Sequence, residues 1–225
     1  MKKSVVASLL FLMGTISVFS QTGEEILARA EAAANPDTDI EALLSMTISD
    51  ARGGSESRSI RMYQRGSEQV LIRFLSPADI RGVALLIDSR DRNGDLIYLY
   101  MPAFRRERRI ASHVKNEEFM GTGLTYEDMA EIDYSGTYEV VDWGQTGSDY
   151  TLELRSKQES STYDGALMVV DGESYLPLRT ELVRGGSVVK RLTVEEVNRH
   201  QGYWYAARTV VDLPDSGRRT VLEID

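Results

Sequence analysis

From residue 40 onward, pairs of turn-forming residues interrupt the sequence at short intervals, and this spacing constrains the fold more than any other feature. Leu44, Met46 and Ile48 alternate with polar residues, the period-two pattern of a strand with one buried face. The turn signals follow one another at distances typical of consecutive hairpins. They fall at 53–54, 65–66, 93–94, 135–136, 147–148, 164–165, 171–172, 185–186 and 215–217. The sequence therefore predicts a mainly β (α+β) protein with about ten or eleven strands, nearly all antiparallel.

Two stretches depart from this pattern and predict helices. Thr22 followed by Glu25 has the spacing of a capping box, and apolar residues then recur at helical intervals until Pro36. In the centre of the chain, Thr125 and Asp128 stand at the N-cap and N3 positions of a second, shorter helix. We expect one N-terminal helix and one short central helix.

The first twenty residues have the composition of a secretory signal peptide. Lys2 and Lys3 precede an apolar run over 5–13, and the small residues Val18 and Ser20 suit a cleavage site. The run is too short to span a bilayer, which needs about 20 apolar residues. We expect export, removal of residues 1–20, and a single domain over 21–225. Without cysteine, the exported protein has no site for a cysteine-linked lipid anchor.

Composition excludes several classes of function. The 225 residues include no Cys and only two His, which rules out disulfides and a cysteine nucleophile and disfavours a zinc site. A net charge of −9 argues against a nucleic-acid binder. The chain has no G-x-S-x-G, P-loop or H-E-x-x-H motif. We therefore expect no catalytic residues, no metal and no cofactor, and interpret the protein as a non-enzyme.

Three consecutive predicted strands are apolar on both faces. They lie at 70–75, 83–87 and 96–101. Such antiparallel strands must be covered on both sides. The N-terminal helix is one candidate cover; the opposite wall of a barrel, or a ligand that fills it, is another. The pattern also fits the central strands of a packed sandwich.

One basic cluster stands out in this acidic protein. Arg105, Arg106, Arg108 and Arg109 surround Glu107. The cluster could contact an anionic partner, such as a phospholipid headgroup or the acidic face of another protein. It could equally be a solvated strand end with one internal salt bridge.

A glycine-rich segment follows at 118–124. Phe119, Met120 and Leu124 are large and apolar, and they stand beside Gly121 and Gly123. This composition fits a movable apolar flap over a cavity, because glycine permits backbone conformations closed to other residues. It fits a packed loop that plugs a barrel equally well.

Three motifs in this order indicate a family. They are FLSPADIRG at 74–82, LIYLYMPAFRR at 96–106 and FMGTGLTYEDM at 119–129. Together they resemble the family of outer-membrane lipoprotein-sorting proteins related to the periplasmic carrier LolA. The resemblance implies a half-open antiparallel β-barrel closed on its concave side by helices. It further implies a periplasmic location, an apolar cavity that holds acyl chains of a lipid or lipoprotein, and work beside an inner-membrane transporter.

The double-sided strands then acquire specific roles. The candidate acyl-binding residues are Val70, Ile72, Phe74, Val83, Leu85, Ile87, Ile97, Leu99 and Met101. The candidate rim or flap residues are Phe104, Phe119, Met120 and Leu124. The candidate contacts to a partner or headgroup are Arg105, Arg106, Arg108 and Arg109. We expect a monomer that binds no nucleic acid. The alternative is a periplasmic sensor or adaptor of the same fold, its barrel filled by its own side chains, that binds a protein partner.

Overall fold

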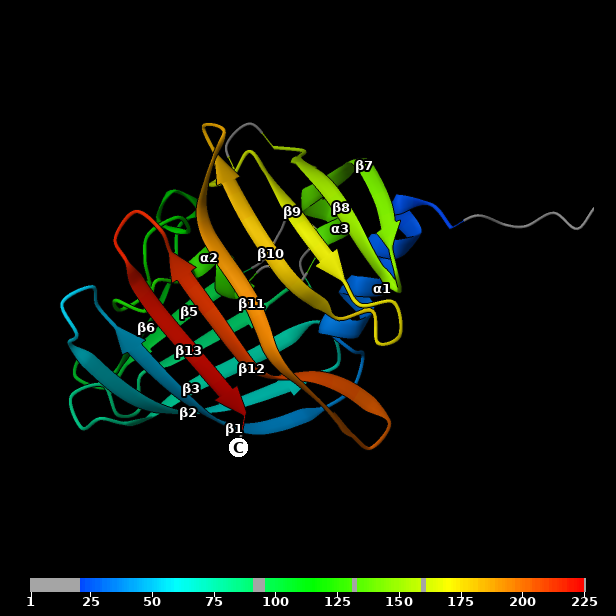
Figure 1. The fold of residues 1–225 in the computed structure, drawn as a ribbon. Helices are drawn as coiled ribbons and strands as arrows, with labels where there is room; N and C mark the ends of the chain where they lie inside the picture. Colours follow the sequence, from blue (N-terminus) through cyan, green and yellow to red (C-terminus); the bar gives the residue numbers. More distant parts are fainter. Residues whose placement is uncertain (1–20, 91–95, 131–132, 159–160, 225) are drawn as a thin grey trace, which may run out of the picture.

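The described strands form one continuous, strongly curled antiparallel sheet. The computed structural model describes residues 21–90, 96–130, 133–158 and 161–224. Within them the strand order is β6-β5-β4-β3-β2-β1-β13-β12-β11-β10-β9-β8-β7. Figure 1 shows the sheet wrapped around its helices, with β6 and β7 as its two free edges. The strands are β1 (Ile40–Ser49), β2 (Ser55–Arg65), β3 (Gln69–Ser76), β4 (Ala84–Asp88), β5 (Leu96–Met101), β6 (Arg106–Arg109), β7 (Tyr138–Thr146), β8 (Asp149–Ser156), β9 (Gly165–Val170), β10 (Pro177–Arg184), β11 (Ser187–His200), β12 (Tyr203–Leu213) and β13 (Arg218–Ile224).

Hairpins account for every pairing in this sheet except one. β1 pairs with β13, with Met46 opposite Leu222. This pairing joins the two ends of the described chain, so that β1–β6 and β7–β13 become two parts of one curled wall. The sheet is open, and the half-open antiparallel architecture expected from the sequence is confirmed.

The helices lie on the concave side of the sheet (Figure 1). α1 (Gly23–Ala34) begins with the predicted capping box, in which Thr22 and Glu25 bond each other's backbone. α2 (Tyr126–Ala130) and α3 (Tyr134–Thr137) are single turns, and a 3₁₀ turn, η1, spans Ser112–Val114. At α2 the Asp128 carboxylate accepts a hydrogen bond from the Thr125 backbone nitrogen, and the Thr125 hydroxyl accepts one from the Asp128 nitrogen, as expected. None of the helices among the described residues is long and apolar enough to cross a membrane.

The buried apolar residues separate into two clusters. The first cluster comes from the inner face of β1–β5 together with residues of the following segment. The second cluster comes from α1 and the inner face of β8–β10. Ile26, Leu27 and Ala30 supply the helical side of the second cluster. The N-terminal helix, one candidate cover for the double-sided strands, therefore packs on the second cluster instead.

The turn signals locate most of the hairpins, with instructive differences. The sheet has thirteen described strands, because the turns at 102–105 and 201–202 carry weak signals and each adds a hairpin. Ser135-Gly136 lies inside α3, so this pair belongs to a helical turn that Asp133 caps by accepting a bond from the Gly136 nitrogen. The predicted turn at 93–94 and the predicted signal peptide at 1–20 lie outside the described residues.

Candidate functional site

The nine candidate acyl-binding residues converge on the inner face of the first part of the sheet. Strand pairing places Ile72 opposite Leu85 and Leu85 opposite Leu99, so that one row of apolar side chains crosses three strands. Phe74, Leu85, Ile87 and Ile97 are fully buried. Val83 and Leu99 are also buried, and Val70, Ile72 and Met101 pack against this group while partly exposed. All nine belong to the first cluster.

A segment that begins as a turn and ends in the short helix α2 covers this row; its residues, 117–130, are called the covering segment below. Phe119 is completely buried, with its ring 5.8 Å from that of Phe74 and 5.2 Å from that of Tyr126 between centroids. Leu124 is buried and Met120 packs against the cluster. In this state the protein's own aromatic rings occupy the centre of the first cluster.

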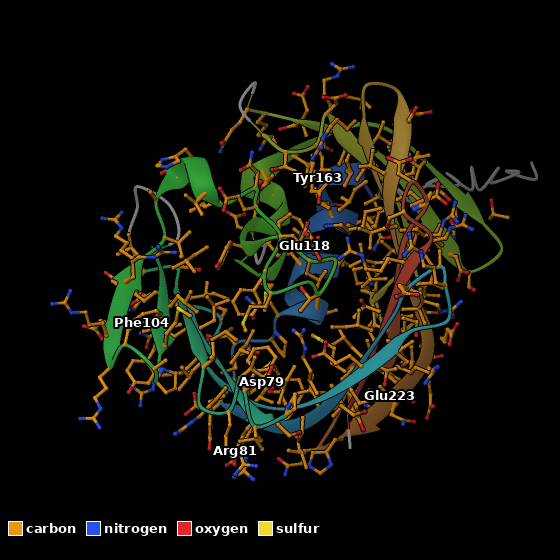
Figure 2. The ribbon with its side chains drawn as sticks, turned by 90° about the vertical axis from the view of Figure 1, so that its left-hand side faces the viewer. Asp79, Arg81, Phe104, Glu118, Tyr163 and Glu223 are labelled. Carbon is orange, nitrogen blue, oxygen red and sulfur yellow. The ribbon has the colours of Figure 1, made fainter. Side chains whose placement is uncertain are left out.

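The residues expected together at the rim separate in the structure. Phe119, Met120 and Leu124 lie in the covering segment, whereas Phe104 is 67% exposed at the turn between β5 and β6. Figure 2 shows Phe104 on the edge hairpin, apart from Glu118 of the covering segment. Phe104 therefore takes no part in covering the cluster in this state.

The covering segment has a backbone that few sequences can adopt. Met120, Gly121 and Gly123 have φ values of 49°, 73° and 76°. A Cβ atom on Gly123 would lie 2.6 Å from Cδ1 of Leu213, so a larger residue here would strain the backbone and require the Leu213 side chain to shift. The Phe119 nitrogen donates to the Leu124 carbonyl at 2.8 Å, which closes the segment into a compact turn.

Polar side chains from the sheet hold the covering segment by its backbone carbonyls. Arg58 of β2 donates from Nη2 to the Met120 carbonyl at 2.8 Å, and Thr220 of β13 donates from Oγ1 to the Thr122 carbonyl at 2.7 Å. Arg218 pairs with the Glu118 carboxylate. Arg58 is only 7% exposed, and its Nη1 has no hydrogen-bond partner among the described residues. A buried guanidinium therefore keeps one donor free directly beneath the covering segment.

A buried ion pair joins the covering segment to the second part of the sheet. The Lys190 ammonium of β11 pairs with the Asp128 carboxylate of α2, and both side chains are 5% exposed. The Tyr163 hydroxyl donates to Asp128 Oδ1 at 2.8 Å and lies 2.8 Å from Lys190 Nζ. Sequence reasoning identified Asp128 only as a helix cap and missed Lys190. The sequence signal that could have indicated this ion pair was Lys190 itself, a lone lysine at an inward position of a strand.

Burial also changes the ionisation of the covering segment. Loss of solvent raises the pKa of the Tyr126 hydroxyl above its ordinary value, and the nearby positive charge of Arg108 opposes that rise. The buried position thus favours neutral Tyr126. Among the described residues, no group of three His, Asp or Glu side chains is placed to hold a metal ion.

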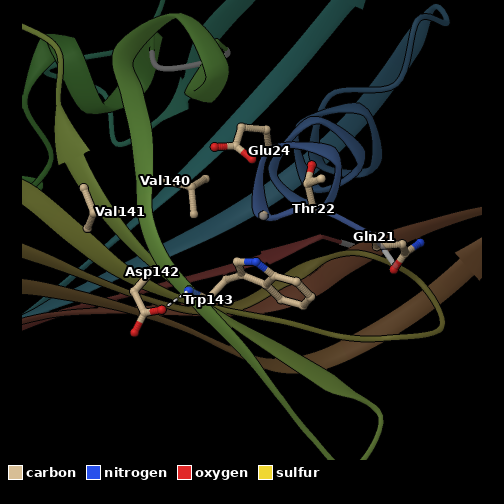
Figure 3. A pocket seen from close by; sticks show the side chains of 8 residues that line it. Gln21, Thr22, Glu24, Val140, Val141, Asp142 and Trp143 are labelled. Carbon is tan, nitrogen blue, oxygen red and sulfur yellow. Dashed lines mark hydrogen bonds between the residues drawn. The ribbon is translucent and has the colours of Figure 1, made fainter. Parts of the chain in front are cut away.

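Two surface pockets lie away from the first cluster. One, of about 410 Å³, lies between the start of α1 and strand β7; Figure 3 shows Trp143 beside Thr22 there. The other, of about 490 Å³, lies on the outer face of β1–β4, where Tyr63, Leu71 and Leu86 form a row across three strands. Neither is lined by a candidate acyl-binding residue.

A family model described as "uncharacterized protein" matches residues 66–225, most of the described sheet. The chain belongs to this family. Among curated proteins, none matches the chain by sequence.

Solved structures identify the fold of this family. One similar structure is a candidate outer-membrane lipoprotein-sorting protein domain from Vibrio parahaemolyticus, with 26% identity, 90% coverage of each chain and a TM-score of 0.81. A DUF1329 family protein from Desulfovibrio piger has 24% identity, the same coverage and a TM-score of 0.81. A LolA superfamily protein from Nitrosomonas europaea has 19% identity, 92% coverage of each chain and a TM-score of 0.73. The fold is that of the LolA-like lipoprotein-sorting proteins, and the resemblance found in the sequence is confirmed.

Proposed function

We propose that this protein is a periplasmic carrier that binds acyl chains of a lipid or lipoprotein and moves them between membranes or from an inner-membrane transporter. The chains would occupy the space that the rings of Phe119 and Tyr126 fill in the closed state. One observation supports this most directly. A single apolar row across β3–β5 is covered by a glycine-containing turn that polar side chains hold by its carbonyls.

The energetics favour exchange between the covering segment and an acyl chain. Re-exposing Phe119 and Tyr126 to water costs about 2–3 kcal/mol each. An acyl chain gains about 0.8 kcal/mol for each methylene it buries, or about 10 kcal/mol for a dozen. The hydrogen bonds from Arg58 and Thr220 are each worth about 1 kcal/mol net. Measured from water, a chain of a dozen methylenes therefore offsets the cost of exposing these two rings and losing these two bonds.

Arg58 has a further part in the proposal. When the covering segment moves, Nη2 of Arg58 loses its bond to the Met120 carbonyl. Nη1 of Arg58 already has no partner among the described residues. The buried guanidinium would then present free donors to an ester carbonyl or carboxylate of the cargo. Binding of this kind requires no catalytic group, in keeping with a non-enzymatic role.

The test is uptake of a fluorescent fatty acid by the protein recovered from the periplasm of an expression host, with native mass spectrometry for co-purified lipid. Phe119→Ala removes the ring that fills the cluster and should increase dye uptake about tenfold or more, since a Phe side chain contributes about 2–3 kcal/mol of burial. Ile72→Trp adds bulk to the same space from a partly exposed position and should reduce uptake.

Leu167→Ala is the matched control, because Leu167 is 41% exposed on the outer face of β9. It should leave uptake unchanged. If neither the parent protein nor Phe119→Ala takes up the dye, and no lipid co-purifies, the carrier function is wrong.

The filled first cluster favours a second function, a periplasmic sensor or adaptor that binds a protein partner. In that case Phe119 and Tyr126 are permanent core residues. Phe119→Ala would then lower stability without creating dye binding. The same experiment therefore separates the two functions.

A further inference from the structure

We propose that the β5–β6 hairpin is a membrane-binding element that inserts Phe104 into the interface of an anionic phospholipid bilayer. The inference concerns the outside of the molecule and does not depend on acyl-chain binding by the first cluster. Three features of the hairpin support it, namely its unpaired charges, its exposed aromatic side chains and its position at a free edge of the sheet.

The hairpin concentrates positive charge, with four arginines against one glutamate, Glu107. Arg105, Arg106, Arg108 and Arg109 are all exposed, and none forms an ion pair within the described residues. The internal salt bridge with Glu107 that the sequence allowed is absent from these contacts. Four unpaired arginines on one edge of a chain with net charge −9 are strongly asymmetric. Anionic headgroups complement such a cluster.

Strand pairing spreads these charges over both faces of the hairpin. Arg108 lies opposite Leu99, on the inward register, whereas Arg109 lies opposite Tyr98 on the outward register. The edge therefore presents guanidinium groups on both sides of β6 and at its turn. When this edge meets a planar bilayer, arginines on both faces of β6 can contact lipid headgroups.

Aromatic side chains complete the surface. Phe104 is the most exposed large apolar side chain of the described residues, at 67%, and Tyr100 is 40% exposed on the neighbouring strand. Arg105 follows Phe104 with a φ of 48°, a left-handed conformation that glycine would adopt with less strain. Aromatic rings beside arginines are typical of segments that lie in a membrane interface.

Protection of a free sheet edge explains only part of this arrangement. Charged side chains commonly prevent edge strands from pairing with other chains. The opposite edge, β7, is protected by acidic residues such as Glu139 and Asp142. Edge protection needs charge of either sign, and it does not account for a phenylalanine exposed at the turn. An acidic protein surface would match the arginines, but the protruding Phe104 favours a bilayer.

The experiment is co-flotation of the purified exported protein with lipid vesicles. The vesicles contain phosphatidylcholine alone, or equal parts of phosphatidylcholine and phosphatidylglycerol. We expect binding to the phosphatidylglycerol vesicles only, decreasing as salt increases, because exposed charges are screened. Arg105→Gln/Arg109→Gln should weaken partitioning about 25-fold, since each interfacial charge contributes about fivefold. Phe104→Ser should weaken it about tenfold, from lost apolar burial.

Matched controls make the same chemical changes elsewhere. Arg52→Gln/Arg179→Gln removes two exposed arginines that form no ion pair within the described residues, and Tyr203→Ser removes a 51% exposed aromatic from the start of β12. Both should leave partitioning within about twofold. Failure of the parent protein to bind phosphatidylglycerol vesicles, or equal losses in the control variants, would overturn the proposal. Dye uptake measured on the same preparations reports separately on the carrier function.

Discussion

The two apolar clusters of this protein are built from the same sheet but covered in different ways. Helix α1, with its capping box and three turns, covers the second cluster by direct side-chain packing of Ile26, Leu27 and Ala30. A single-turn segment with left-handed residues covers the first cluster, and sheet side chains hold it by its carbonyls. The cover of the first cluster combines the buried rings of Phe119 and Tyr126 with polar bonds that can be exchanged, whereas the cover of the second cluster depends on buried apolar area alone. This difference suggests one permanent core and one that can open.

Lys190→Met should have the largest effect, because it breaks the joint between the two regions. It leaves the Asp128 carboxylate buried and unpaired, which costs about 3–5 kcal/mol. Urea unfolding gives the stability change. The double variant Asp128→Asn/Lys190→Met should recover much of the loss, since no charge is then buried. A single-variant loss below about 1 kcal/mol would contradict a buried pair.

Alanine substitutions at the centres of the two clusters should give different results. Leu152→Ala in the second cluster should lower the free energy of unfolding by about 2–5 kcal/mol and leave dye uptake unchanged. A Phe→Ala change in a rigid core lowers the free energy of unfolding by about 3–5 kcal/mol. Phe119→Ala should lower it by less, since opening of the covering segment limits the loss. Equal behaviour of the two variants in both assays would remove the distinction between the clusters.

A smaller effect is expected at the cap of α1. Thr22→Ala removes the hydroxyl that accepts a hydrogen bond from the Glu25 backbone nitrogen. It should lower the free energy of unfolding by about 1 kcal/mol. Thr22→Ser should restore it. If α1 covers only the permanent core, dye uptake by Thr22→Ala stays at the parent level, and an increase would show that α1 also controls access to the first cluster.

The smallest effect distinguishes two tyrosines, one in each region. Burial raises the pKa of Tyr126, whereas the hydrogen bond received from Gln21 is the main cause that lowers the pKa of Tyr175. Near-ultraviolet titration should therefore lose a late-titrating group in Tyr126→Phe and an early one in Tyr175→Phe. Because the folded pKa of Tyr126 lies above 10.0, its contribution to the closed state is present below pH 10.0 and lost as pH rises further. A closed state in Tyr126→Phe that is equally sensitive to alkaline pH would contradict this assignment.

Local patterns in the sequence determined much of this protein. Most hairpins followed from turn residues, the start of α1 from Thr22 and Glu25, and the inward face of β1 from the alternation of Leu44, Met46 and Ile48. Each of these depends on residues close together in the chain, where φ preferences, capping bonds and side-chain period act directly.

Only the tertiary structure decided how the regions meet. Phe104 and Phe119 looked equivalent in the sequence, yet one is 67% exposed and the other completely buried. The difference arises because the β1–β13 pairing joins the two parts of the curled sheet. The curl brings Arg58, Lys190 and Thr220 around the covering segment. Contacts between residues so distant in the chain depend on the path of the whole sheet, and no local spacing encodes that path.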